Sequence, residues 1–154
     1  VFKGHTINKF AEILEKKNLN IYGFDSFQGL EEDWITEEYH PVKTFSLNQK
    51  RPKVKNNVKL VVGSVQNTLK DFIKNKSDQK IIFVHMDLDT YESTKYVLEN
   101  IKNRLDKGAI ILFDEFYGFP NWKKYEFKAF QEVFTEGEYT YIAFSKRQVA
   151  VKIN

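Results

Sequence analysis

Hydrophobic positions along the chain alternate between the spacing of helices and the spacing of strands. Apolar residues that recur three and four positions apart predict amphipathic helices. These fall at residues 6–17, from 65 onward, at 93–105 and at roughly 125–134. Short apolar runs between the helices predict strands. They occupy residues 21–24, 58–62, 81–86 and 109–113. Strand and helix therefore follow each other in turn.

The end of the chain departs from this alternation. Apolar runs at residues 139–144 and 148–153 flank a three-residue connection, which is short enough for a hairpin. Strand–helix alternation indicates an α/β fold with a mostly parallel sheet, right-handed crossovers and helices on both faces. The hairpin then adds an antiparallel edge. Residues 31–57 are polar and form a long excursion, for which we expect one short helix and a role as a functional lid.

The start of the chain suggests a missing strand. Residues 1–4 lead straight into a helix, so we expect the strand that should feed this helix to be absent and the fold to be truncated at its N-terminus. Otherwise, residues 1–154 are expected to form a single domain, because a chain of this length buries roughly 70% of its unfolded surface.

Composition bears on whether the chain binds nucleic acid, forms disulfides or spans a membrane. Apolar residues make up 42% and aromatic residues 16% of the chain, as in a folded protein. The net charge of +3 comes from scattered lysines. The basic cluster at residues 50–55 favours a solvated loop over a nucleic-acid site, because no aromatic stacking platform accompanies it. The absence of cysteine excludes disulfides and fits a cytoplasmic location, and no apolar run approaches a membrane span. The sequence leaves a homo-oligomer open.

Candidate chemistry gathers where predicted strands end. In open α/β sheets ligands bind beyond the carboxyl ends of the strands. Four predicted strands are each followed directly by acidic residues, a hydroxyl or glycine. These residues are Asp25 with Ser26, Gly63 with Ser64, Asp87 with Asp89, and Asp114 with Glu115. Their shared placement predicts one site.

The acidic residues of this site suit a divalent metal. Asp87 and Asp89 are two positions apart, so on an extended backbone both project to the same side. With Asp114 and Glu115 on the next strand, several carboxylates converge, and a hard cation such as Mg²⁺ relieves their repulsion. The alternative is structural: Asp89 caps the following helix, while Asp114 and Glu115 pair with lysines.

Three further residues have weaker signals. His85 precedes Asp87 by two positions, and a packed strand histidine is favoured over a metal ligand or base. Asp25 with Ser26 fits a contact to a ribose hydroxyl, the usual role of an acidic residue after a strand in nucleotide-binding sheets. Gly4, just before the first helix, would let a ligand approach the positive helix N-terminus.

Three segments together resemble a known family. Residues 23–30 (GFDSFQGL), 84–95 (VHMDLDTYESTK) and 111–117 (ILFDEFY) resemble the macrocin O-methyltransferase family of S-adenosylmethionine-dependent enzymes. The resemblance implies a Rossmann-like class I methyltransferase fold and a Mg²⁺-assisted transfer of a methyl group to a hydroxyl. The implied acceptors are small molecules, mainly sugars on natural products.

The resemblance also implies roles for individual residues. Metal ligation would fall to Asp87, Asp114 and Glu115, with Asp89 as the general base. Residues near the methyl donor would include Gly4, Asp25 at the ribose with Ser26 beside it, Gly63 and Ser64 at the adenine, and Asp87.

Two rival interpretations stay open at this point. A phosphatase of the haloacid dehalogenase type also uses two aspartates one residue apart after an apolar strand, but there the pair follows the first strand of the chain. The other rival is a degenerate domain that keeps the fold without catalysis, which the missing first strand favours.

Overall fold

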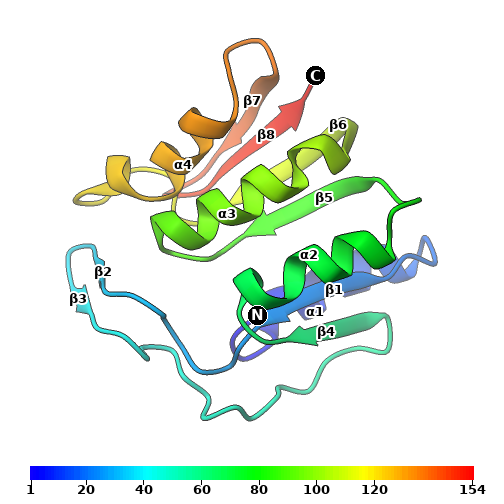
Figure 1. The fold of residues 1–154 in the computed structure, drawn as a ribbon, viewed down its shortest axis with the longest axis horizontal. Coiled ribbons are helices and arrows are strands. Elements are labelled where there is room, and N and C mark those ends of the chain that lie inside the picture. Colours follow the sequence, from blue (N-terminus) through cyan, green and yellow to red (C-terminus); the bar gives the residue numbers. More distant parts are fainter. The chain divides into compact units, whose positions relative to one another are not determined.

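The computed structural model describes all residues from 1 to 154, and they form two compact units (Figure 1). Unit 1 comprises Val1–Glu32 and Pro41–Thr68. Unit 2 comprises Asp33–His40 and Leu69–Asn154. Helix α2, Val65–Asn75, begins in the first unit and continues into the second. None of the helices combines the length and the apolar content needed to cross a membrane.

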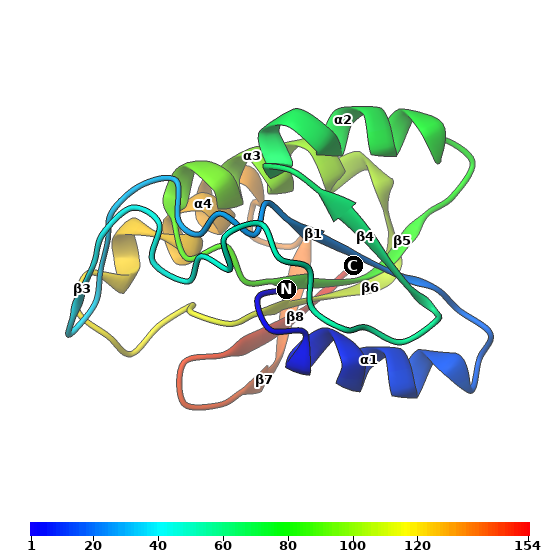
Figure 2. The ribbon, with the colours of Figure 1, turned by 90° about the horizontal axis from the view of Figure 1, so that it is seen from below.

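Unit 1 is built on two parallel strands and a helix. Strands β1 (Ile21–Asp25) and β4 (Val58–Val62) pair in parallel and form a two-stranded sheet of their own. Helix α1 (His5–Glu15) lies along one face of this sheet (Figure 2). Its apolar stripe supplies Ile7 and Ala11 to a small core, as the three-and-four spacing predicts.

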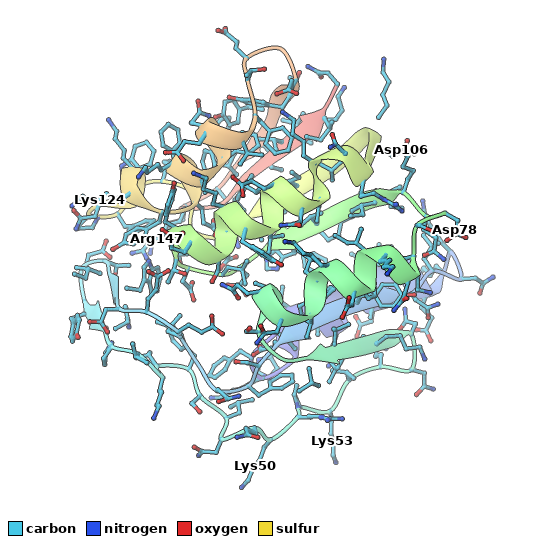
Figure 3. The ribbon with its side chains drawn as sticks, viewed as in Figure 1. Lys50, Lys53, Asp78, Asp106, Lys124 and Arg147 are labelled. Carbon is cyan, nitrogen blue, oxygen red and sulfur yellow. The ribbon has the colours of Figure 1, made fainter.

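The predicted basic cluster lies in unit 1, in the connection that leads to β4. Figure 3 shows Lys50 and Lys53 pointing outward from the chain, and both are exposed. The Nζ atom of Lys55 lies 3.7 Å from a carboxylate oxygen of Glu12 and 3.9 Å from one of Glu15. This arrangement is that of a solvated loop whose innermost lysine pairs with a neighbouring helix.

Unit 2 contains a four-stranded sheet in the order β5-β6-β8-β7. Its strands are β5 (Ile81–Met86), β6 (Leu105–Phe113), β8 (Val149–Ile153) and β7 (Tyr139–Phe144). The pair β5–β6 is parallel, whereas β8 runs antiparallel to both β6 and β7. The C-terminal hairpin is therefore present where the apolar runs predict it, and it forms the antiparallel part of the sheet.

Two helices cover one face of this sheet. Helices α3 (Tyr91–Ile101) and α4 (Glu126–Val133) lie side by side on it (Figures 1 and 2). Two short 3₁₀ turns, η1 (Lys102–Arg104) and η2 (Trp122–Lys124), follow α3 and precede α4. The core between sheet and helices is aromatic: the rings of Phe113 and Phe130 are fully buried and their centroids lie 5.1 Å apart.

The structure differs from the expected sheet in two respects. The strands form separate sheets in the two units, so only the pairs β1–β4 and β5–β6 are parallel. Strand β5 is an edge of its sheet, and Ile82 is 53% exposed, although its apolar sequence predicts cover on both faces. The helix predicted to reach residue 105 also ends earlier, at Ile101, because β6 begins at Leu105.

The long excursion contains a hairpin and no helix, contrary to expectation. Strands β2 (Trp34–Ile35) and β3 (Tyr39–His40) pair antiparallel within unit 2. The hydroxyl of Tyr125 accepts the Ile35 N–H at 3.1 Å, and the Trp34 ring packs edge-on against Phe119 at 6.2 Å. Contacts distant in sequence therefore hold this hairpin, which explains why the local pattern does not predict it.

Candidate active site

The acidic residues of unit 2 lie together at the carboxyl ends of β5 and β6. The two strands are parallel with Met86 opposite Phe113, so the residues after each strand start at the same level. The Asp114 N–H continues the ladder by donating to the Met86 carbonyl at 3.0 Å. Figure 3 shows Arg147 at this end of unit 2, with Asp78 and Asp106 at the opposite end. We call the group Asp87, Asp89, Asp114 and Glu115 the carboxylate edge.

Asp89 has an unusual backbone conformation at this edge. Its φ is 62°, a left-handed value that aspartate adopts more readily than most residues and that often marks functional sites. The backbone turns here into Thr90, the N-cap of α3. The prediction that Asp87 and Asp89 share a side by strand alternation is therefore wrong, because the extended backbone ends at Met86. Asp87 is exposed, whereas Asp89 is partly buried.

The electrostatics of Asp89 are those of a carboxyl that resists ionisation. Burial is the largest cause that raises its pKa, to about 8. The like charges of Asp87, Glu115 and Asp114 raise it further, in that order. These interactions also mean that all four carboxylates lie within electrostatic range of one another. A carboxyl that exchanges its proton near neutral pH can act as a general base.

Asp114 is held by His85 on β5 and by Gln148, just before β8. Its Oδ1 lies 3.5 Å from the Nε2 of His85 and accepts a hydrogen bond from the Nε2 of Gln148 at 2.5 Å. The bond from His85 is the largest cause that lowers the pKa of Asp114, and the bond from Gln148 adds to it against the opposing effect of burial. The His85 side chain is 15% exposed, which agrees with a packed strand histidine that contacts the site.

Glu115 is partly neutralised by an arginine. Its Oε2 lies 3.3 Å from the Nη1 of Arg147, whose Nη2 lies 2.8 Å from Glu37 in the β2–β3 hairpin. The Arg147 guanidinium also lies over the Phe119 ring, 5.3 Å from its centroid. Burial raises the pKa of Glu115, Arg147 lowers it, and the charges of Asp114 and Asp87 raise it. Sequence analysis did not single out this arginine.

Sequence analysis also missed Glu126, a fully buried acid in the first turn of α4. Its Oε2 accepts the Glu115 N–H at 3.1 Å, whereas its Oε1 has no hydrogen-bond partner. Burial raises the pKa of Glu126 well above its usual value, the Glu115 N–H opposes this, and nearby aspartates raise it further. A signal was present in the sequence: Glu126 stands three and four positions before Ala129 and Phe130, on the apolar stripe of the helix.

The carboxylate edge has the oxygen ligands that a hard cation prefers, but its side chains are not arranged to bind one in this structure. Carboxylate oxygens are the ligands that Mg²⁺ prefers, and a cation would relieve the repulsion among the like charges that helps to raise the pKa of Asp89. The Oε1 atom of Glu126 is a further oxygen without a hydrogen-bond partner. However, no three His, Asp or Glu side chains are placed so that they could hold a metal ion. Asp114 is turned toward His85 and Gln148, and Glu115 toward Arg147, so cation binding requires these side chains to reorient.

The predicted cofactor residues that follow β1 lie in unit 1. Both oxygens of Asp25 accept backbone hydrogen bonds, Oδ1 from Phe27 at 2.7 Å and Oδ2 from Phe2 at 2.8 Å. Oδ2 also lies 3.2 Å from the N-terminal amino group of Val1. Oδ1 therefore keeps a second lone pair with which the carboxylate can accept a ribose hydroxyl. The Ser26 hydroxyl accepts the Gln28 N–H at 3.1 Å and shapes the same turn.

The glycines predicted to approach a ligand both have positive φ. Gly4, the N-cap of α1, has a φ of 84° and no side-chain cap, and Gly63 after β4 has a φ of 140°. A Cβ added at Gly63 would lie 2.8 Å from the Cγ2 of Thr68, so glycine is required there for space as well as for conformation. The carbonyl of Ser64 accepts the hydroxyl of Thr68 at 2.8 Å in the first turn of α2.

Comparisons with known proteins bear on the family and the fold of the chain. A family model described as a methyltransferase domain matches residues 1–116. The calicheamicin methyltransferase CalS11 is 24% identical over 99% of this chain and 69% of its own, with a TM-score of 0.79. An apo structure of CalS11, described as a TDP-rhamnose 3'-O-methyltransferase, is 23% identical over 95% of this chain and 65% of its own, with a TM-score of 0.67.

A third structure, of the O-methyltransferase NovP, is 19% identical over 99% of this chain and 69% of its own, with a TM-score of 0.71. At such identities these likenesses establish the fold. They confirm the predicted Rossmann-like fold with mixed helices and strands. No curated protein matches the chain. The family match argues against the phosphatase alternative.

Proposed function

The chain belongs to the methyltransferase domain family whose model matches residues 1–116, and we propose that it methylates a hydroxyl of a small molecule. The methyl donor is S-adenosylmethionine, which this fold implies. The finer assignment to the macrocin O-methyltransferase family is part of the same proposal and rests on the three segments that resemble it.

One observation carries the proposal: Asp89 is a partly buried carboxyl with a pKa raised to about 8, in a left-handed turn at the carboxyl end of β5. Catalytic bases work best when their pKa lies near the working pH, and burial among like charges is how a carboxyl reaches that range. A purely structural helix cap has no need of this environment. Asp89 is therefore our candidate for the general base.

The reaction balances without a further reactant. The acceptor oxygen forms a bond to the methyl carbon while the bond from that carbon to sulfur breaks, and its electron pair stays on sulfur. The hydroxyl proton passes to a carboxylate oxygen of Asp89. In-line geometry at the carbon requires that donor and acceptor be held on opposite sides of the methyl group, which is the main task of the surrounding residues.

For the methyl donor, we assign the residues that follow β1 and β4 together with Gly4, and Asp87 after β5. Asp25 would accept the ribose hydroxyls with Ser26 beside it, Gly63 and Ser64 would border the adenine, and Gly4 would open the N-terminus of α1. Asp87 is assigned to the donor side as well as to the metal. The second lone pair on Oδ1 of Asp25 and the positive φ of Gly63 support these assignments.

For a metal, we assign Asp87, Asp114 and Glu115. Their oxygen chemistry and the effect of their like charges on the pKa of Asp89 support this assignment. When bound, a divalent cation supplies positive charge that lowers the pKa of an acceptor hydroxyl. The protein's own contribution is to hold the backbone of Glu115 through its N–H. The Asp114 side chain bonds His85 and Gln148 in the present arrangement and has to turn from them to contact a cation.

The acceptor that we propose is a sugar or natural-product glycoside. CalS11 is described as a TDP-rhamnose 3'-O-methyltransferase, which supports a sugar hydroxyl for a chain that shares its fold. The cytoplasmic location, the single-domain organisation and a homo-oligomeric state remain predictions.

Two binding measurements test the proposed function. In isothermal titration, S-adenosylmethionine should bind, whereas a degenerate domain would give no heat. In thermal unfolding, Mg²⁺ or Mn²⁺ should raise the melting temperature and a chelator should reverse the rise, since a ligand at 100 times its Kd stabilises by about 2.7 kcal/mol. If neither metal nor chelator moves the melting temperature while the methyl donor binds, the metal assignment is wrong and the methyltransferase assignment stands.

A further inference from the structure

Glu126 is a buried acidic side chain of unit 2 that should lower the stability of the fold and that the proposed mechanism leaves unexplained. It is fully buried, and its Oε1 has no hydrogen-bond partner. Burying a carboxyl that has an oxygen without a hydrogen-bond partner costs free energy whether or not the group is ionised. Proteins rarely keep such a group in a helix stripe where methionine or leucine would pack, unless it holds something else in place.

The usual structural explanations do not account for it. Acidic residues in a first helical turn often bond the free N–H groups of their own helix, but α4 has no side-chain cap hydrogen bond. The hydrogen bond of the Glu126 side chain is made outside its own helix. Oε2 accepts the N–H of Glu115, which lies just after β6 and eleven positions earlier in the chain. The side chain thus joins α4 to the carboxylate edge.

The hydrogen bond from Glu115 to Glu126 fixes the turn where β6 ends. The Asp114 N–H still belongs to the ladder with β5, through the Met86 carbonyl at 3.0 Å. The next N–H, that of Glu115, has left the ladder and is held by Glu126 at 3.1 Å. The Phe116 N–H then donates to the Arg147 carbonyl at 2.9 Å. Glu126 therefore supplies the middle one of three consecutive anchors.

We propose that Glu126 is a positioning residue of the carboxylate edge, which fixes the backbone of Glu115 and so aims the side chains of Asp114 and Glu115. Groups that orient metal ligands from behind typically contribute 10- to 100-fold to metal affinity. The proposal rests on the proposed function only where metal binding is the readout. The anchoring of the Glu115 backbone is independent of it.

The test compares Glu126→Gln with Glu126→Met. Glutamine keeps an oxygen that can accept the Glu115 N–H, whereas methionine has a similar volume and no acceptor. Phe134→Leu is the matched control, because Phe134 is buried where α4 ends, stacks on Phe130 and has no contact with the edge. Two quantities are measured on the whole chain: amide hydrogen exchange at Glu115 by NMR, normalised to Phe113, and Mn²⁺ affinity by titration.

We expect Glu126→Gln to keep the slow exchange of the Glu115 amide and a Mn²⁺ affinity close to that of the unmodified chain. Glu126→Met should speed this exchange and weaken Mn²⁺ binding by about tenfold or more. Phe134→Leu should change neither quantity. Rescue by glutamine is what separates positioning from a general loss of packing.

Other outcomes overturn the proposal or separate it from the proposed function. If Glu126→Gln binds Mn²⁺ as weakly as Glu126→Met while Glu115 stays protected, the negative charge itself matters and Glu126 is a ligand. If Glu126→Met changes neither quantity, Glu126 has no positioning role. If the unmodified chain binds no Mn²⁺ but Glu126→Met still releases the Glu115 amide, positioning stands and the metal assignment fails. Should Glu126→Met not fold, faster exchange in Glu126→Gln is enough to refute the proposal.

Discussion

Two groups of acidic side chains in unit 2 have opposite electrostatics. At the carboxylate edge and behind it, the pKa values of Asp89, Glu115 and Glu126 are raised, with burial as the largest cause each time. The second group, which we call the helical acids, is Glu132 in α4 and Glu138 in the turn that follows α4. Their pKa values are lowered by hydrogen bonds from lysines. The same residue type therefore serves two different purposes within one small unit.

The helical group shows how acids are arranged for stability. Glu132 Oε2 accepts the Nζ of Lys95 at 2.7 Å and the hydroxyl of Tyr91 at 2.6 Å. Glu138 Oε2 accepts the Nζ of Lys102 at 2.8 Å. Each carboxylate has its own cation close by. Exposed ion pairs of this kind are screened by solvent and contribute little to stability, and their geometry needs no additional ligand.

The carboxylate edge has few cations for its charge. The Arg147 guanidinium contacts Glu115, but it also pairs with Glu37. The pKa of Asp114 is lowered mainly by the hydrogen bond from His85. Structural acids are paired, whereas these carboxyls are held close together at a cost in stability. Perturbed groups of this sort concentrate at functional sites, where the missing charge is supplied by a ligand or a proton. The contrast is what marks the edge as the candidate site.

The largest expected effect is on turnover, when a carboxylate of the edge is replaced by the amide of the same shape. Asp89→Asn removes the proposed base while keeping its shape, so turnover should fall by roughly 10²- to 10⁴-fold with metal and methyl-donor binding retained. Asp87→Asn should instead weaken metal affinity and, through it, the positioning of the acceptor. Metal affinity and turnover are measured for both variants in an active preparation with an identified acceptor.

The pair of variants can also contradict the assignments. If Asp89→Asn loses metal affinity and Asp87→Asn keeps it, the two roles are reversed. If both variants remain fully active, catalysis does not use this edge and the comparison with the helical acids loses its functional meaning.

The next effect concerns the stability of the metal-free chain. A carboxyl whose pKa is raised on folding holds its proton more tightly in the folded state. Its contribution is therefore complete below the ordinary pKa of 3.8 and is lost as the pH rises through about 8 for Asp89. In chelator, the free energy of unfolding should fall between these pH values, by at most about 1.4 kcal/mol per pH unit for each such group.

Denaturant titrations at a series of pH values measure this slope, and Asp89→Asn is the variant that isolates its source. The variant should have a flatter dependence because asparagine does not titrate. A slope that is unchanged in Asp89→Asn would mean that Asp89 ionises freely and that its environment is ordinary.

Much of the fold follows from local sequence patterns. The strands at residues 58–62 and 81–86 have the expected bounds, and the C-terminal hairpin forms around a connection at residues 145–148, one residue longer than expected. Apolar runs flanked by polar turns define such strands within a few residues, so no distant contact is needed to find them. The placement of acidic residues after strands likewise brings Asp87 and Asp114 to one end of the β5–β6 pair.

The remaining features depend on contacts that a local pattern does not contain. The β2–β3 hairpin is held by Tyr125, about ninety positions away, so its short strands have no local signal. The left-handed conformation of Asp89 arises where the chain leaves β5 for α3, which strand alternation does not describe. Arg147 and Glu126 reach the edge from other elements, and only their positions in the folded unit reveal what they hold.

The smallest expected effect tests the helical side of the comparison. Glu138 accepts hydrogen bonds from Lys102 and, at 2.6 Å, from the Thr135 N–H, which together lower its pKa to about 2. Because its pKa is lowered on folding, its contribution is present above the usual 4.5 and is lost as the pH falls through about 2. Glu138→Gln should therefore cost about 0.5–1 kcal/mol, evenly between pH 5 and 8, since the partly exposed pair is screened by solvent. Glu136→Gln, two positions away on the exposed side, is the control and should cost less.

Denaturant unfolding measures the free energy of unfolding of both variants, and Mn²⁺ titration is run alongside. If Glu138→Gln changes Mn²⁺ affinity, or if its cost grows toward high pH as expected for the edge, the two groups of acids are not independent.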